Sequence, residues 1–365
     1  MIFRPLSDSL RITFCLPVTG HNPIGGHKVI YEYANRLSER GHKITLVHPS
    51  VSRRDCGIKE QILRYMINGK RYLTGEYRPD SWFKLSRSVD YVLAPDLSEK
   101  YLPDADVVIA TAWQTAEWVN EYSSAKGRKF YFIQHLETWN GPEDRVHATW
   151  DFPVEKIAIA RWLQLFAESR GQTCHYVPNG LDFSTFGKDL SAEKRDPFQV
   201  LMLYHRQEFK GSVDGICALV ALKNEFPQLK ANLFGVFSRP KDLPSWIDYF
   251  QNPEQSMLRQ LYNEAAIFIS PSIAEGWPLP PAEAMQCGTA VVGTDIGGHR
   301  EYMEPEVTAL LCTAQNPSSI ENQVRRLLLN PTFRVELAES GYKSIQRFVW
   351  NTSVDRLERI LTVAH

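Results

Sequence analysis

The fold of this chain is decided by residues 266–292, which read AIFISPSIAEGWPLPPAEAMQCGTAVV. A short apolar run over 266–270 is followed by a loop rich in glycine and proline, a helical stretch over 281–287 and a second apolar run over 290–292. Gly288 suits the end of that stretch, because glycine readily adopts the left-handed conformation that closes a helix. Strand, helix and strand in this order, with strands that are apolar throughout, predict a parallel sheet covered on both faces.

The same alternation continues outward from this segment. Short apolar runs predict strands, and apolar residues at helical spacing between them predict helices. The predicted strands are 12–16, 44–47, 107–110, 130–133, 175–177, 199–203 and 230–234, and the further predicted helices are 28–40, 158–168, 212–225, 255–265, 318–329 and 332–348. Residues 54–90 lack a clear period and are interpreted as an insertion or irregular strands.

Length and composition limit the number of domains and the possible classes of protein. A chain of 365 residues suggests two domains at about 150 residues each. Residues 182–197 are polar and without strong periodicity, so we predict two successive α/β domains joined near residue 185. The hydrophobic content of 43% excludes a disordered chain, and no apolar run is long enough to span a membrane. Lys plus Arg number 41 against 42 for Asp plus Glu, which argues against nucleic acid as a partner.

The first residues and the spacing of the cysteines indicate the cellular compartment. The first residues lack the apolar region of a secretory signal. The six cysteines are dispersed and none forms a Cys-x-x-Cys pair, which disfavours a zinc cluster or dithiol site and fits a reducing cytoplasm. We therefore expect a cytoplasmic protein.

The loop and helix after residue 270 carry the strongest chemical signal. Gly276 lets a phosphate or sugar approach the backbone, and Pro280 or Pro281 suits the first turn of the helix. The N–H groups of a helix start form an anion site. Glu275 in the loop and Glu283, placed in the first helical turn, could both accept hydrogen bonds from one ligand's hydroxyl groups. The alternative is that an acid such as Glu283 only complements the helix dipole.

A second signal follows the strand over 199–203, in the sequence YHRQEFKG of residues 204–211. Arg206 and Lys210 could bind an anion such as a phosphate without a metal ion. The alternative is a solvated loop with two cations. We predict no metal site, because the histidines lack ligand spacing.

The first domain offers two loops at predicted strand ends, where open α/β sheets bind ligands. In HNPIGGHK, residues 21–28, Gly25 and Gly26 give backbone amides access to a phosphate or an acceptor. This is not G-x-G-x-x-G, which weakens a dinucleotide interpretation. His135 lies at the end of the strand over 130–133, where a structural and a functional role are both open. Candidates for the acceptor side are Trp113, Gln114 and Glu137.

Residues 271–288 resemble the E-x7-E region of the retaining glycosyltransferases of family 4. The continuation over 288–301, GTAVVGTDIGGHRE, and the sequence PNGLD of residues 178–182 are similar to that family as well. The resemblance covers most of the chain and is weakest at 50–105 and 235–250. It implies a GT-B fold, in which two Rossmann-like doubly wound domains face each other across a cleft and the last helix crosses back to the first domain.

The resemblance also implies domain roles. An acceptor-side domain would cover residues 1–183 with 346–365 returning to it, and a donor-binding domain would cover 184–345. Glu275 would bind hydroxyl groups of the donor sugar, and Glu283 those of the ribose. Arg206 and Lys210 would face the diphosphate, and His135 the transferred sugar. The remaining donor contacts would come from Gly25, Gly26, Gly276, Trp277, Pro278 and Leu279.

The predicted function is a metal-independent retaining glycosyltransferase with no cofactor. It would move a hexose, with glucose favoured, from a nucleotide-sugar donor, with UDP favoured, to a glycan or lipid-linked glycan in polysaccharide or glycoconjugate biosynthesis. The rivals are a GT-B nucleotide-sugar epimerase or phosphorylase and a non-catalytic nucleotide-sugar binder. Peripheral association with the inner membrane face is left open, because the helix over 28–40 is too mixed in charge to decide it.

Overall fold

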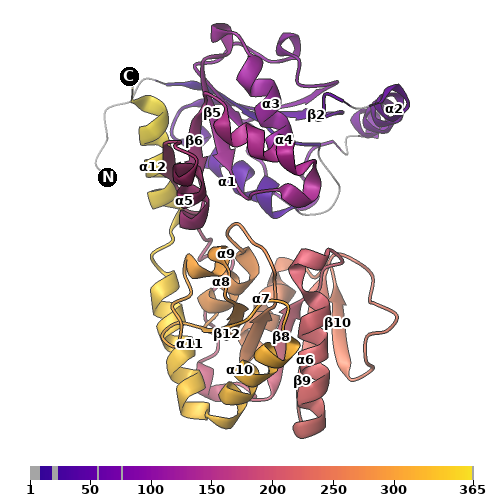
Figure 1. Ribbon diagram of the computed structural model, residues 1–365, viewed down its shortest axis with the longest axis vertical. Helices are drawn as coiled ribbons and strands as arrows, with labels where there is room; N and C mark the ends of the chain where they lie inside the picture. Colours follow the sequence, from indigo (N-terminus) through magenta and orange to yellow (C-terminus); the bar gives the residue numbers. More distant parts are fainter. Residues whose placement is uncertain (1–8, 19–23, 56, 75–76, 364–365) are drawn as a thin grey trace. The chain divides into compact units, whose positions relative to one another are not determined.

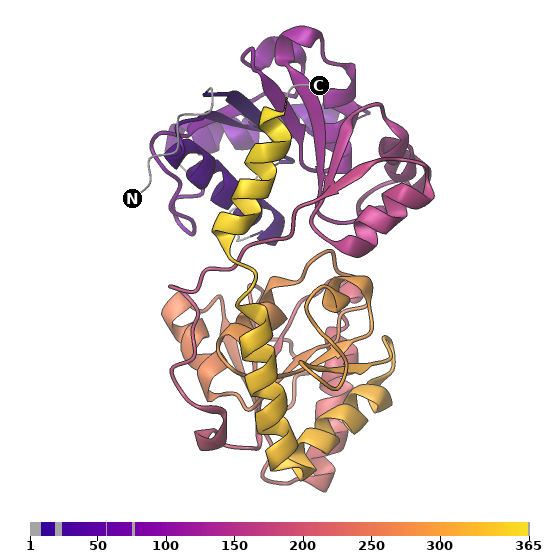
Figure 2. The same ribbon diagram turned by 90° about the vertical axis from the view of Figure 1, so that its left-hand side faces the viewer.

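The structure is a computed structural model that describes residues 9–18, 24–55, 57–74 and 77–363. The chain divides into two compact units, whose segments can be followed in Figures 1 and 2 by colours that run along the sequence. Unit 1 comprises residues 1–178 together with 351–365, and unit 2 comprises 179–350. Each unit is built on a parallel sheet with helices packed against it, so the predicted fold class is confirmed.

In the described residues, unit 1 contains a seven-stranded sheet of order β3-β2-β1-β4-β5-β6-β7. The order reverses between β1 and β4, the switch point of a doubly wound sheet. Strand β4 is buried along its whole length, as expected for a central parallel strand. The bounds are β1 Arg11–Cys15, β2 Lys43–Pro49, β3 Asp90–Ala94, β4 Val107–Ala110, β5 Arg128–Ile133, β6 Glu155–Ala158 and β7 Cys174–Tyr176.

The last helix of the chain belongs to unit 1, as the fold class required. Helix α12 buries Val354, Leu357 and Leu361, and its Glu358 accepts hydrogen bonds from Arg40 and His42 beside β2. The α-helices of this unit are α1 Gly25–Glu39, α2 Ile58–Thr74, α3 Trp113–Glu121, α4 Glu143–Ala148, α5 Arg161–Ser169 and α12 Trp350–Thr362.

Unit 2 contains a sheet of order β10-β9-β8-β11-β12-β13, in which β8 and β11 are neighbours. Its core is aliphatic, with Val200, Leu219 and Ile269 among its buried members. The strands are β8 Gln199–Leu203, β9 Lys230–Gly235, β10 Ile247–Gln251, β11 Ile267–Ser270, β12 Ala290–Thr294 and β13 Leu310–Cys312. The helices are α6 Ser212–Glu225, α7 Gln255–Glu264, α8 Leu279–Gln286, α9 Gly297–Arg300, α10 Pro317–Leu329 and α11 Pro331–Ile345.

Two sequence-based assignments in unit 1 are wrong. The helix predicted over 158–168 starts at Arg161, because the apolar residues up to Ala158 form β6. Periodicity alone cannot separate a short buried strand from the start of a helix. Residues 54–90, interpreted as an insertion or irregular strands, contain the 17-residue helix α2. His21, Asn22 and Pro23 of the first predicted loop lie outside the described residues.

No helix in the described part of the chain is both long and apolar enough to cross a membrane.

Candidate active site

Two loops of unit 2 are joined at the carboxyl edge of its sheet. One follows β8 and carries Lys210, and the other follows β11 and carries Glu275. The N–H of Ile273 donates to the carbonyl of Phe209 at 2.7 Å, which ties the loops together. Gly211 has φ +62°, and a Cβ there would lie 2.0 Å from the carbonyl oxygen of Pro271. Only glycine fits this close approach, which brings Lys210 beside the end of β11.

Lys210 and Glu275 form the central contact of these loops. Lys210 Nζ donates to Glu275 Oε1 at 2.7 Å and to Oε2 at 3.0 Å, and Ser272 Oγ donates to Oε1 at 2.8 Å. Although burial opposes its charged form, the nearby ammonium and these hydrogen bonds hold the pKa of Glu275 below its ordinary value. Glu275 is therefore a carboxylate that accepts hydrogen bonds, next to a cation that attracts anions.

Glu283 lies in the second turn of α8, so its predicted place in the first turn is wrong. Helix α8 begins at Leu279 rather than at Pro281. The Glu283 side chain is buried, and its Oε2 accepts a hydrogen bond from Tyr262 Oη at 3.1 Å. A buried acid here is held by a specific partner, and it does not occupy the turn in which acids stabilise a helix start.

The start of α8 has fewer amide donors than the sequence suggested. Pro280 and Pro281 occupy its first turn, and proline has no N–H. Among the first three helical residues, only Leu279 therefore carries an amide hydrogen. Tyr302 Oη donates to the carbonyl of Pro278 at 2.6 Å and fixes the start of the helix.

The two remaining loop residues of this segment are buried. Gly276 is buried, and the Trp277 indole lies 4.8 Å from the Tyr302 ring and 5.4 Å from the Phe348 ring between centroids. The Trp277 side chain is thus part of an aromatic cluster of unit 2. Any contact of Trp277 with a ligand therefore falls to its backbone.

Arg206 is not brought to the Lys210–Glu275 pair. Its side chain is exposed, its Nη2 donates to Ser238 Oγ at 3.1 Å, and its guanidinium lies 4.8 Å from the Phe237 ring centroid. An exposed guanidinium held by one neutral hydrogen bond is free to change rotamer.

His299 is a residue that sequence reasoning missed. It is fully buried on α9, where its Nε2 lies 2.8 Å from Ser270 Oγ and its Nδ1 lies 2.7 Å from the carbonyl of Thr294. Burial lowers its pKa, and neutral His299 donates from Nδ1 to that carbonyl. The adjacent Gly298 packs its backbone against that of Glu275. The histidine thus connects β11, β12 and α9 behind the Glu275 loop.

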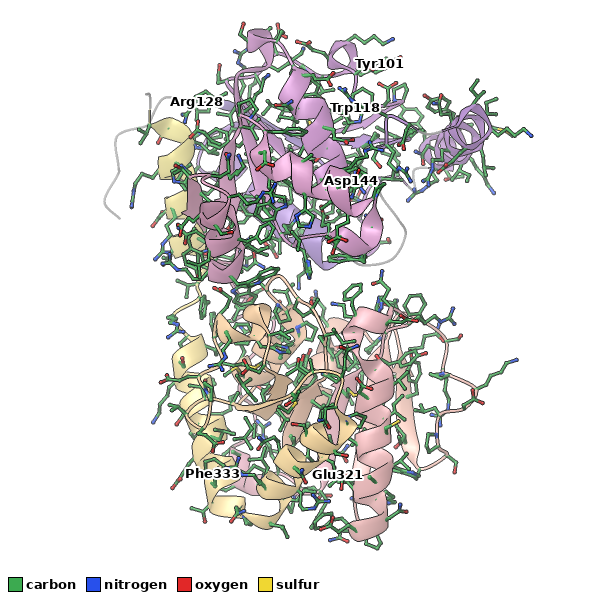
Figure 3. The ribbon with its side chains drawn as sticks, viewed as in Figure 1. Tyr101, Trp118, Arg128, Asp144, Glu321 and Phe333 are labelled. Atoms are coloured by element: carbon green, nitrogen blue, oxygen red, sulfur yellow. The ribbon has the colours of Figure 1, made fainter. Side chains whose placement is uncertain are left out.

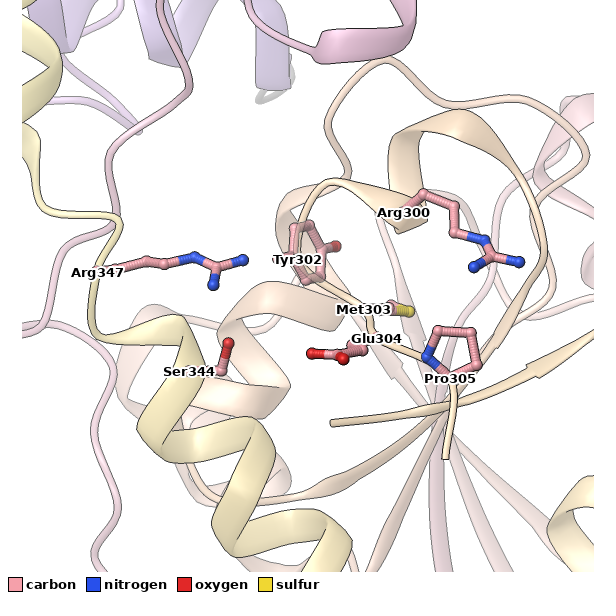
Figure 4. A pocket seen from close by; sticks show the side chains of 7 residues that line it. All are labelled: Arg300, Tyr302, Met303, Glu304, Pro305, Ser344 and Arg347. Atoms are coloured by element: carbon pink, nitrogen blue, oxygen red, sulfur yellow. The ribbon is translucent and has the colours of Figure 1, made fainter. Parts of the chain in front are cut away.

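A pocket of unit 2 lies beside α9 and the end of α11, as Figure 4 shows. It was not predicted. It shares Tyr302 with the start of α8, and its Arg300 is paired with Asp295. Its lining residues are Arg300, Tyr302, Met303, Glu304, Pro305, Ser344 and Arg347.

In unit 1, the start of α1 meets the loop after β5 at the carboxyl edge. Gly25 and Gly26 open α1, and a Cβ on Gly26 would lie 3.4 Å from the Gln134 side chain. His135 follows, with its ring 4.1 Å from that of Trp139 and 5.8 Å from that of Trp162. The N–H of Leu136 donates to His135 Nδ1 at 2.8 Å, which places the ring proton of the neutral form on Nε2.

The three acceptor-side candidates differ in accessibility. Trp113 is fully buried and Gln114 nearly so. Glu137 has φ +62°, and its Oε2 accepts the N–H of Trp113 at 2.7 Å, at the start of α3. Burial raises the pKa of Glu137 to about 7, although this hydrogen bond opposes the shift. Glu137 therefore joins two loops of unit 1 and titrates near neutrality.

Over the described ranges, no group of three or more His, Cys, Asp and Glu side chains has the arrangement of a metal site.

Residues 192–344 match the family model described as "Glycosyl transferases group 1". The match contains β8, β11, α8 and both joined loops of unit 2. These residues of unit 2 are therefore similar to the group 1 glycosyl transferases.

Curated relatives match the chain over short segments. The chain is 28% identical over 100 residues to D-inositol 3-phosphate glycosyltransferase of Nocardiopsis dassonvillei, which is 27% of this chain and 23% of the relative. It is 30% identical over 110 residues to the protein of that name from Thermomonospora curvata, covering 30% of this chain and 26% of the relative. The chain thus matches about a quarter of each relative's length.

Solved structures resemble the chain over nearly its whole length. Alr3699/HepE of Anabaena, in complex with UDP-glucose, has a TM-score of 0.71 at 16% identity and covers 96% of this chain and 99% of its own. Sucrose-phosphate synthase of Thermosynechococcus elongatus has a TM-score of 0.69 at 15% identity, with 96% and 98% covered. These likenesses show a common fold for both units.

Proposed function

We propose that this protein is a retaining glycosyltransferase that moves a hexose, with glucose favoured, from a UDP-sugar to an acceptor hydroxyl. The observation that carries the proposal is the contact of Lys210 with Glu275 on two joined loops of the region that matches the group 1 glycosyl transferases. The UDP-glucose complex of the similar Anabaena protein supports the choice of donor.

The chemistry suits these residues. The bond between the anomeric carbon and the diphosphate oxygen breaks, and UDP leaves with the electron pair. The acceptor oxygen forms the new bond on the same face, and its proton passes to the departing phosphate oxygen. Lys210 stabilises the charge that grows on the diphosphate, since a fixed cation acts strongly at a site shielded from water. Arg206 joins it after a change of rotamer.

Recognition of the donor falls to the two acids. Glu275 is ionised at neutral pH because of its contacts, so it accepts hydrogen bonds from sugar hydroxyl groups. Glu283 does the same for the ribose hydroxyls, with Tyr262 holding its carboxylate. The backbone at Gly276, Trp277, Pro278 and Leu279 lies along the diphosphate and sugar. In this scheme, side chains neutralise the negative charge of the diphosphate, and no metal ion takes part.

Unit 1 receives the acceptor in this proposal. Gly25 and Gly26 contribute backbone contacts to the donor, and His135 contacts the transferred sugar. Of the acceptor-side candidates, Glu137 reaches the ligand, whereas Trp113 and Gln114 hold the loop from beneath. The acceptor is a glycan or a lipid-linked glycan, the product is a polysaccharide or glycoconjugate, and the protein works in the cytoplasm.

A transfer assay tests the proposal. The full chain is incubated with UDP-, GDP-, dTDP- and ADP-sugars and a panel of glycan acceptors, with and without a chelator. We expect nucleotide release from UDP-glucose to depend on an acceptor and to resist chelation. Glu275→Ala should abolish transfer and leave part of the UDP binding, because UDP is held mainly through Glu283 and the loop backbone.

The matched control is Glu339→Ala, which removes the acid of another Lys–Glu contact of unit 2, that with Lys188 at 2.9 Å. It should leave transfer unchanged. Donor consumption without an acceptor would favour an epimerase, and binding without turnover would favour a nucleotide-sugar binder. A strict requirement for Mn²⁺ or Mg²⁺ would contradict the metal-free mechanism.

A further inference from the structure

The pocket at the end of α11 takes no part in the proposed transfer. Its volume is about 280 Å³, its lining residues all belong to unit 2, and none of them lies on the two joined loops. Figure 3 labels Phe333 in the first turn of α11, and the pocket lies at the opposite end of this helix, beside Ser344. Drug-sized ligands occupy roughly 300–1,000 Å³, so this volume suits a smaller ligand, about the size of one monosaccharide.

Two opposite charges line this pocket. Arg347 is exposed, and within the described part of the chain its guanidinium has no acidic partner. Glu304 is exposed too and, over the same residues, has no cationic partner. Arg300, by contrast, donates two hydrogen bonds to Asp295, at 2.6 and 2.8 Å. Figure 4 shows Arg347 entering from the α11 side and Glu304 from the segment after α9. The pocket thus offers a guanidinium for an anion and a carboxylate that accepts hydrogen bonds.

The remaining lining residues suit a sugar ring. Tyr302 and Met303 are buried and form an apolar wall, and Ser344 contributes a hydroxyl group. Tyr302 is fixed in place, because its Oη donates to the carbonyl of Pro278 at 2.6 Å. An apolar wall with a few polar groups placed around it is the usual construction of a small-molecule site.

We propose that this pocket binds a sugar acid, a monosaccharide that carries one carboxylate. A carboxylate fits a guanidinium through two parallel hydrogen bonds, so Arg347 holds this group. The sugar hydroxyls donate to Glu304 and exchange hydrogen bonds with Ser344, and the ring lies against Tyr302. A phosphate ester suits the pocket less well, because it brings about two negative charges next to Glu304 while Arg300 is already neutralised by Asp295.

Isothermal titration calorimetry of the full chain tests this assignment, with glucuronate as the probe. We expect glucuronate to bind at least ~10-fold more tightly than glucose, which lacks the charge-assisted hydrogen bonds to Arg347. Acetate, which lacks the sugar ring, should also bind more weakly, and so should glucose 6-phosphate. UDP should not displace glucuronate, because the pocket shares no lining residue with the two joined loops.

Arg347→Gln removes the partner of the carboxylate and should weaken glucuronate binding at least ~10-fold. The matched control is Lys343→Gln, which removes the same charge from the last turn of α11 but lies outside the pocket lining. It should bind glucuronate as the unchanged protein does. Both variants replace exposed side chains, and equal thermal unfolding confirms that they fold. Glucuronate binding needs neither donor nor acceptor, so its outcome is separate from that of the transfer assay.

Each of the following results would overturn the proposal. Calorimetry could detect no binding of glucuronate at millimolar concentration. A tighter complex with glucose 6-phosphate would assign the pocket to phosphate esters, and displacement of glucuronate by UDP would make it part of a nucleotide site. Equal weakening by Arg347→Gln and Lys343→Gln would mean that the general positive charge of this end of α11, rather than Arg347, attracts the ligand.

Discussion

The carboxyl edges of the two sheets carry different chemistry on the same kind of scaffold. In unit 2 the edge is ionic, with Lys210 against Glu275 on joined loops. In unit 1 it is aromatic, with His135 beside Trp139 and Trp162. Parallel strands place loops at one edge in both cases, and the loops decide what the edge can bind. An ionic edge suits a diphosphate, whereas an aromatic edge suits the uncharged face of a sugar ring.

Lys210→Ala is the strongest test of the difference between the two sheet edges. If the ionic edge of unit 2 stabilises the departing diphosphate, turnover should fall about 100-fold or more, as for other fixed charges at a transition state. Steady-state kinetics with UDP-glucose measures the loss. Lys188→Ala removes the lysine of the comparable contact with Glu339 and should cost almost nothing. Equal turnover in the two variants would show that the edge of unit 2 does not serve the reaction.

The backbone beneath the ionic edge is tested by Gly211→Ala. Both φ +62° and the approach of Pro271 oppose a Cβ, so we expect a loss of about 2–3 kcal/mol in the free energy of unfolding. Gly171→Ala in unit 1 provides the control, because φ there is +73° but nothing lies within 4 Å of the added Cβ. That variant should lose about 1 kcal/mol. Chemical denaturation compares them, and equal losses would mean that the close approach is unimportant.

The smallest expected effect concerns Glu137 at the edge of unit 1. Its pKa is about 7 in the folded protein, above the ordinary 4.5, so the folded state binds the extra proton. Its stabilising contribution is complete below pH 4.5 and is lost as pH rises through 7. Between about pH 5 and pH 8 this amounts to a loss of roughly 2 kcal/mol.

Glu137→Gln should remove this part of the pH dependence. Thermal unfolding followed from acid to mildly alkaline pH would show a flatter profile for the variant than for the unchanged chain. Parallel profiles would mean that Glu137 titrates as an ordinary surface acid.

Much of the fold could be predicted from the sequence. The bounds of β4, β8 and α6 were predicted to the residue. Each is a stretch with one pattern of apolar residues, and the pattern stops clearly at both ends. Helix α2 was missed for a physical reason. Its apolar side chains face water, so the helical period of Ile58, Ile62 and Met66 did not indicate a core-facing helix.

The candidate site was predictable in its residues and less so in its contacts. Lys210 and Glu275 were both identified, but their ion pair depends on β8 and β11 being neighbours, which is a property of the sheet order. The separation of Arg206 from that pair depends on Phe237 and Ser238 of another loop. His299 gave no signal, because a buried histidine that connects strands through backbone and hydroxyl groups leaves no pattern in one sequence.

The assignment of α12 to unit 1 has a consequence for biosynthesis. A ribosome makes residues 1–178 first, then all of unit 2, and only then the helix that carries Val354, Leu357 and Leu361. The surface of unit 1 that α12 covers therefore stays exposed while unit 2 is synthesised and folds. Nascent chains of this protein expose that apolar surface longest, so it is where a chaperone would have the most time to bind.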